Sequence, residues 1–116
     1  MLAAANRLRR AADINRVYKR GVYGSAEGQL SLKATANHLP ASRAVVVVGK
    51  KVDKRAVVRN RIRRRLVALL RDQWGTLPAG YDIVISVHAN LSEQPPARLQ
   101  TLLTTALQRA RLVPHS

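Results

Sequence analysis

The chain has 116 residues, 47% of them hydrophobic, and its 21 lysines and arginines outnumber 6 aspartates and glutamates, for a formal net charge of +15 at pH 7. The hydrophobic content argues against wholesale disorder, and the length suits a single domain, residues 1–116. The lack of cysteine excludes disulfides and thiolate metal sites, and no apolar run approaches the roughly 20 residues of a membrane helix.

The first half of the chain predicts one helix and two or three strands. Apolar side chains recur at helical spacing over residues 7–20, and Gly21 marks the expected end of that helix. Residues 28–35 alternate between apolar and polar side chains, which predicts a half-buried strand. The unbroken run AVVVV at 44–48 predicts a fully buried strand.

The second half predicts a helix, a strand and a final helix. The first helix runs from about residue 56 to 73 and is ended by Gly75 and Pro78. An apolar strand follows at 81–87, and an amphipathic helix at 97–112. This order of elements predicts a small α+β sandwich, with helices packed on a mixed sheet.

The predicted helix over residues 56–73 has two unlike faces. The stripe expected to pack on the sheet holds Val58, Ile62, Leu66, Leu69 and Leu70. The opposite side collects Asn60, Arg61, Arg64, Ala68 and Arg71, with Arg59, Arg63 and Arg65 at the boundary. No acid occurs between Arg55 and Arg71, although like charges at i, i+4 destabilise a helix by about 0.2–0.5 kcal/mol per pair. The pattern favours a polyanion-binding surface over a merely solvated face.

The types of side chain on this face narrow the choice of polyanion. The planar guanidinium of arginine suits phosphate oxygens and stacks on bases. Asn60 can donate and accept hydrogen bonds at a base edge or a 2′-hydroxyl. A membrane-binding helix would instead carry Trp or Phe on its apolar face. The chemistry favours a nucleic-acid partner over a membrane.

Three segments together resemble the protein subunit of bacterial ribonuclease P. The segment RNRIRRRL at 59–66, preceded by KKVDKRAVV, is similar to the basic signature of that family. The segment LRRAADINRVYKRG at 8–21 is similar to its first helix, and GYDIVISV at 80–87 resembles its later strand. The expected order of elements also matches, and the three segments span most of the chain.

The resemblance implies a fold and a function. The implied fold is an α+β sandwich of αβββαβα order (ribosomal protein S5 domain 2-like) with a left-handed βαβ crossover, although about 98% of such crossovers are right-handed. The implied protein is cytoplasmic, needs no protein oligomer, and binds a catalytic RNA and the 5′ leader of precursor tRNA. It assists endonucleolytic tRNA 5′-end maturation without catalytic protein residues. Mg²⁺ would be bound mainly by the RNA, and no organic cofactor is expected.

The resemblance also implies which residues bind RNA. Those that match the signature and its basic surroundings are Arg59, Asn60, Arg61, Arg63, Arg64, Lys50, Lys51 and Arg55. Ile14 and Tyr18 occupy the positions of two aromatic residues that line a cleft for the leader. Ile14 departs from the usual Phe, which leaves only Tyr18 as a stacking platform. His88 stands where an Arg is common, and a neutral His binds phosphate less strongly.

Other interpretations stay open. An independent nuclease would need clustered carboxylates to hold Mg²⁺, whereas the acids here are scattered; Asp13 is expected at a helix start and Asp82 at a strand edge. A ribosomal or other structural RNA-binding protein fits the charge, size and fold class equally well. A cleft for single-stranded RNA beside the first helix would distinguish that alternative, unless Ile14 and Tyr18 are plain core residues.

Overall fold

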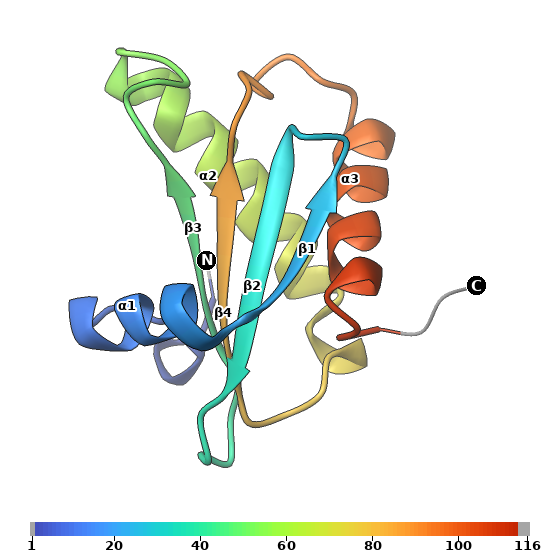
Figure 1. The fold of residues 1–116 in the computed structure, drawn as a ribbon. Coiled ribbons are helices and arrows are strands. Elements are labelled where there is room, and N and C mark those ends of the chain that lie inside the picture. Colours follow the sequence, from blue (N-terminus) through green and yellow to red (C-terminus); the bar gives the residue numbers. More distant parts are fainter. Residues whose placement is uncertain (1, 114–116) are drawn as a thin grey trace.

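The computed structural model describes residues 2–113 and has the expected αβββαβα order (Figure 1). Its main elements are α1 (Ala11–Arg20), β1 (Val22–Ala26), β2 (Leu30–Ala36), β3 (Arg43–Val48), α2 (Ala56–Asp72), β4 (Tyr81–Val87) and α3 (Pro96–Arg109). Two short 3₁₀ helices, Ala4–Asn6 and Trp74–Thr76, precede α1 and follow α2. The predicted strand at 81–87 is confirmed to the residue, and the predicted strand at 44–48 lacks only its first residue, Arg43.

The four strands form one mixed sheet in the order β1-β2-β4-β3. The β1–β2 and β2–β4 pairs are antiparallel, and β3 runs parallel to β4. In Figure 1 both parallel strands point upward, β4 lies to the right of β3, and α2 passes behind the sheet between them. This geometry makes the βαβ crossover left-handed, as the resemblance implied.

The two faces of the sheet are covered unequally. Helices α2 and α3 pack on one face and close the main core, in which Leu32, Ile85 and Leu103 are fully buried. Helix α1 crosses the other face near one end of the strands (Figure 1) and buries only a small cluster of Leu8, Val17 and Val84. Much of that second face therefore stays open beside α1.

The start of the chain differs from the helix predicted over residues 7–20. Helix α1 begins only at Ala11, because the residues before it run along the outer edge of β3. The amide of Leu8 donates a hydrogen bond to the carbonyl oxygen of Ala44 at 3.0 Å, and the Leu8 side chain is buried beneath α1. A backbone partner and a buried side chain hold this segment extended despite its helical spacing.

The faces of α2 agree with the helical wheel. Val58, Ile62, Leu66 and Leu70 are buried against the sheet, whereas Asn60, Arg61, Arg64 and Arg71 are exposed. The boundary arginines Arg59, Arg63 and Arg65 are half-buried. The sheet therefore fixes which arginines point into solvent.

Asp82 was predicted at a strand edge, and that prediction is wrong. Strand β4 is internal to the sheet, and the Asp82 side chain is 0% exposed. Arg43 binds it through Nε and Nη2 at 2.8 and 2.7 Å, Arg16 through Nη2 at 2.7 Å, and Asn37 through Nδ2 at 2.9 Å. Because Arg16 belongs to α1, this carboxylate ties the helix to the sheet.

Burial alone raises the pKa of Asp82. The hydrogen bonds from Arg43 and Asn37, with the positive charges around them, outweigh that effect and hold the pKa below its ordinary value. Asp13 joins the same group through Arg43, at 3.5 Å, and lies in the first turn of α1, as expected. Within residues 2–113, no helix is long and apolar enough to cross a membrane.

Candidate RNA interface

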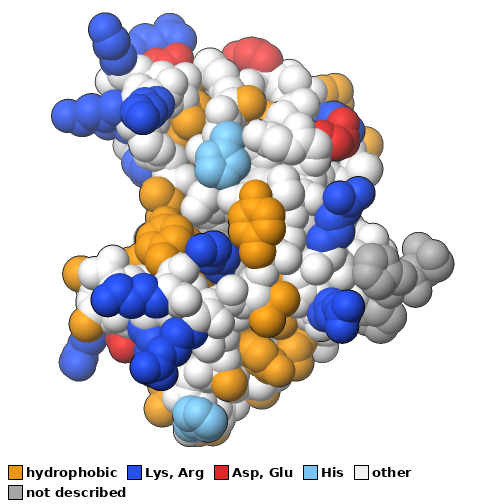
Figure 2. Space-filling model, viewed as in Figure 1, with side chains coloured by type: hydrophobic (Ala, Val, Ile, Leu, Met, Phe, Trp, Pro, Cys, Tyr) orange, Lys and Arg blue, Asp and Glu red, His pale blue; other side chains and the backbone are white. Residues whose placement is uncertain are grey.

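The predicted basic residues gather at the start of α2 and in the loop before it. Lys50, Lys51 and Arg55 are exposed in the loop that leaves β3, and Figure 2 shows a group of basic side chains at that end of the molecule. The exposed Asn60, Arg61 and Arg64 follow on the first turns of α2. The loop after β3 and the first turns of α2 thus carry all eight positions predicted to bind RNA.

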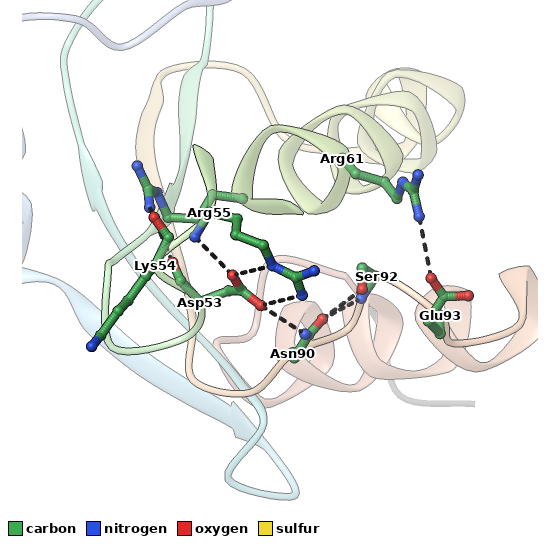
Figure 3. Close-up of polar contacts among 8 residues, drawn as sticks. Asp53, Lys54, Arg55, Arg61, Asn90, Ser92 and Glu93 are labelled. Carbon is green, nitrogen blue, oxygen red and sulfur yellow. Dashed lines mark hydrogen bonds and ion pairs between the residues drawn. The ribbon is translucent and has the colours of Figure 1, made fainter. Parts of the chain in front are cut away.

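The loop before α2 is held by its own polar contacts (Figure 3). Asp53 accepts hydrogen bonds from the Arg55 amide at 2.8 Å and from its guanidinium at 3.1 and 3.0 Å. The hydrogen bond from the Arg55 side chain has the larger effect and that from its amide the next, and together they lower the pKa of Asp53. Arg59 donates to the carbonyl oxygens of Asp53 and Lys54 at 3.0 and 2.7 Å. Arg59 therefore shapes the loop that carries the two lysines.

Several arginines of α2 also have partners within the chain. Arg61 lies 3.2 Å from Glu93 in the loop after β4, and Figure 3 shows the two side chains pointing toward each other. Arg63 donates to the Asn60 side chain, which leaves the Asn60 amide nitrogen available. Arg65 donates to the carbonyl oxygens of Ser92 and Gln94 at 2.8 and 2.5 Å and anchors that loop.

The open sheet face beside α1 carries a second group of side chains. Tyr18 is 40% exposed at the end of α1, and the Lys33 Nζ lies 6.0 Å from the centre of its ring. Tyr23 of β1 pairs in register with Lys33 of β2 and is 56% exposed. In Figure 2 hydrophobic and basic side chains lie side by side on this face. Two exposed tyrosines thus share this face with one ammonium group, a combination suited to unstacked bases and their phosphates.

Sequence reasoning missed Tyr23. The short strand β1 was not delimited in advance, although Tyr23 and Ser25 alternate with the buried Gly24 and Ala26. That period of two was the available signal, and it puts Tyr23 on the open face. Ile14, in contrast, is half-buried and packs against the small cluster beneath α1.

Hydroxyl groups continue the open face away from α1. Ser25, Ser31 and Ser86 lie in register on three neighbouring strands, so their side chains share one face. His88, just after β4, has its Nε2 2.7 Å from the Ser31 Oγ. This row adds neutral hydrogen-bonding groups next to the tyrosines and Lys33.

The carboxylates of the chain are largely engaged by arginines. Asp82 pairs with Arg43 and Arg16, and Asp13 also pairs with Arg43. The other ion pairs among the described residues are Asp53–Arg55, Glu93–Arg61 and Glu27–Arg98. In the part of the chain that the structure describes, no three His, Cys, Asp or Glu side chains form a group that could hold a metal ion.

Known proteins match this chain along most of its length. The model of the family described as Ribonuclease P matches residues 2–111. The ribonuclease P protein component of Streptomyces avermitilis is 36% identical, with 94% of each chain covered. That of Roseiflexus castenholzii is 38% identical over 94% of this chain and 88% of its own length.

Solved structures of RNase P proteins share the fold of this chain. The RNase P protein from Thermotoga maritima superposes with a TM-score of 0.77 at 28% identity, covering 89% of this chain and 96% of its own. The Staphylococcus aureus RNase P protein shares the fold with a TM-score of 0.80 at 24% identity, over 92% of this chain and 96% of its own. Because the family model and these relatives match along nearly its whole length, this chain belongs to the ribonuclease P protein component family.

Proposed function

We propose that this chain binds the catalytic RNA of ribonuclease P through the basic surface of α2 and the preceding loop. The open sheet face beside Tyr18 and Tyr23 binds the 5′ leader of precursor tRNA, and the complex then cleaves the leader endonucleolytically. Two observations carry the proposal: α2 has an arginine face without acids from Ala56 to Arg71, and the open face on the other side of the sheet carries exposed aromatic rings. The protein works in the cytoplasm and needs no second protein copy.

The RNA carries the chemistry of cleavage. Hydrolysis of a phosphodiester by metal ions requires carboxylates or phosphates as ligands, and the carboxylates of this chain are mostly paired with arginine. Mg²⁺ is held mainly by RNA phosphates, and no organic cofactor takes part. The protein neutralises charge and positions the leader, which favours the approach of RNA segments and of the scissile bond to the metal ions.

Reconstitution of the complex from protein and RNA tests whether the RNA carries out the cleavage and the protein assists it. The purified chain is mixed with a ribonuclease P RNA transcript and precursor tRNA, and cleavage is followed at moderate salt. We expect 5′ processing to be faster with the chain than with the RNA alone, and the chain alone to leave the substrate intact. Cleavage by the chain without RNA would overturn the proposal.

Truncating Tyr18 is expected to weaken binding of precursor tRNA more than binding of mature tRNA. Loss of one stacked base costs about 1–3 kcal/mol, or roughly 5- to 150-fold in affinity, and only the precursor carries a leader. The measurement compares dissociation constants of both tRNAs for the holoenzyme made with Tyr18→Ala. Tyr18→Phe keeps the ring and should behave as the parent protein. An equal loss for both tRNAs would assign Tyr18 a purely structural role.

Removing the Glu93 carboxylate is expected to strengthen binding of the catalytic RNA. Glu93 is 86% exposed and occupies Arg61, so its negative charge competes with RNA phosphates. Glu93→Gln should raise the affinity by up to about fivefold, since an exposed ion pair is worth about 0.2–1 kcal/mol. Glu27→Gln, which changes the net charge equally but frees Arg98 elsewhere, is the matched control. Equal gains in RNA affinity from both variants would show that the effect comes only from the change in net charge.

A further inference from the structure

A pocket of about 290 Å³ lies at the outer edge of β3, between the start of the chain and α2. Its apolar lining includes Leu2, Leu8 and Val67. Three guanidinium-bearing side chains, Arg7, Arg9 and Arg63, also line it, and no acidic or aromatic side chain does. The exposed side chains of Asn60, Arg61 and Arg64 on α2 do not line this pocket, and neither do the tyrosines of the open sheet face.

The walls of this pocket are held by contacts of the backbone. Arg7 pairs with Ala44 of β3 in an isolated parallel bridge, and its Nε donates to the Leu2 carbonyl oxygen at 2.8 Å. That bond joins Arg7 to Leu2 within the starting segment, and the Leu2 side chain is buried beside β3. On the opposite wall, Arg63 and Val67 lie one turn apart on the same side of α2.

The pocket opens next to the proposed surface for the catalytic RNA. Arg63 lines the pocket and donates a hydrogen bond to Asn60, which is exposed on that surface. An RNA strand that follows α2 would therefore pass the mouth of the pocket. Arg9 is exposed at the rim of the pocket, and its guanidinium forms no ion pair with another described residue.

We propose that this pocket receives a single unpaired nucleotide of the RNA partner. The base lies against the apolar wall and stacks on a guanidinium plane, a mode that RNA recognition uses where aromatic rings are absent. The phosphate of the same nucleotide binds Arg9 and Arg63. This inference rests on the proposed function, since it requires RNA along α2.

The shape and charge of the pocket favour a nucleotide over other occupants. Apolar walls under an arginine rim match a ligand with one planar apolar part and one anionic part. An acidic peptide adding a strand to β3 would need a free strand edge. Here the Leu8 amide already binds the Ala44 carbonyl oxygen at 3.0 Å, so the starting segment occupies part of that edge.

Titration with AMP, GMP, CMP and UMP, followed by methyl NMR, tests the pocket directly. We expect at least one of these nucleotides to shift the methyl signals of Leu2, Leu8 and Val67. Ribose 5-phosphate should leave those methyl groups unmoved, because it lacks a base. No methyl shift with any nucleotide, or an equal shift with ribose 5-phosphate, overturns the proposal. A shift caused only by an oligoglutamate peptide would assign the pocket to a protein partner and also overturns it.

Filling the pocket provides the second test. Val67→Phe should abolish the nucleotide-induced shifts and lower the affinity for ribonuclease P RNA on the order of 10-fold, the effect of losing one bound base. Leu39→Phe places the same ring at an exposed position of the turn between β2 and β3, outside the pocket and outside both proposed RNA surfaces, and should change the affinity less than the pocket variant. Equal effects of the two variants would contradict a nucleotide site.

Charge variants keep the test valid if Val67→Phe fails to fold. Arg9→Gln removes one charge at the rim, and Arg111→Gln removes one exposed charge beyond α3. Only the first should weaken the methyl shifts caused by nucleotides, and equal weakening would point to general electrostatics. The titration contains neither RNA subunit nor tRNA, so its failure is distinguishable from a failed reconstitution of tRNA processing.

Discussion

Replacing Asp82 with alanine is expected to lower the free energy of unfolding by about 3 kcal/mol, near the lower end of the cost of breaking a buried ion pair. The substitution leaves Arg43, Arg16 and Asn37 without the carboxylate that they share. The loss stays near the lower end because the two arginine side chains are 21% and 36% exposed and can turn to water. Urea unfolding followed by circular dichroism measures the change.

Asp72→Ala is the control for this substitution. Asp72 is an exposed residue at the end of α2, and surface replacements of this kind change stability by less than about 0.5 kcal/mol. The account of the Asp82 network fails if both variants unfold at the same urea concentration. Asp82→Asn keeps the shape but removes the charge, so its stability should fall between the parent protein and Asp82→Ala.

The same network also makes stability depend on pH. The pKa of Asp82 is lowered in the folded protein, so its contribution is complete above the unfolded pKa of about 3.9 and is lost as the pH falls through the lower folded value. We expect the parent protein to lose stability more steeply than Asp82→Ala below about pH 4. Parallel curves for the two proteins would show that Asp82 titrates alike in the folded and unfolded chains.

Replacing Arg59, Asn60 and Arg61 together, as Arg59→Gln, Asn60→Ala and Arg61→Gln, is expected to abolish most stimulation of tRNA 5′ processing. The substitutions remove two charges and one base-reading amide from the proposed RNA surface. The slope of log affinity for the catalytic RNA against log salt should become shallower by roughly 0.7–0.9 for each lost phosphate contact. Binding and single-turnover cleavage are measured at several salt concentrations.

The triple variant is compared with a charge-matched control, and its folding is checked. Arg109→Gln with Arg111→Gln removes the same number of charges at and just beyond the end of α3, away from the start of α2, and should keep processing near the parent level (Figure 1). Because Arg59 also holds the loop before α2, the fold of the triple variant must be checked by thermal unfolding. Undiminished processing by a folded triple variant would show that these residues of α2 do not form the RNA interface.

The sequence predicted those features that depend on local pattern. The apolar stripe and arginine face of α2 followed from helical periodicity, and β4 followed from an apolar run between turn residues. The left-handed crossover came only from family resemblance, because local periodicity carries no information on the hand of a connection. The extended segment before α1 was missed, since its pairing with Ala44 joins residues far apart in the chain.

The polar contacts were harder to foresee than the fold. Asp82 looks like any strand residue in sequence, and only the internal position of β4 together with three donors from other elements reveals its role. Similarly, the partners of Arg61 and Arg65 lie about thirty residues away, in the loop after β4. Spacing along a helix shows which way an arginine points but not which distant loop it meets.

The pairing of the starting segment with β3 has a consequence for handling the protein. Strand β3 is a run of valines at an open sheet edge, the kind of edge that promotes strand-to-strand aggregation. The residues around Leu8 shield part of it through the hydrogen bond to Ala44. A purification tag fused ahead of Leu2 that pulled this segment away would unmask the edge and lower solubility.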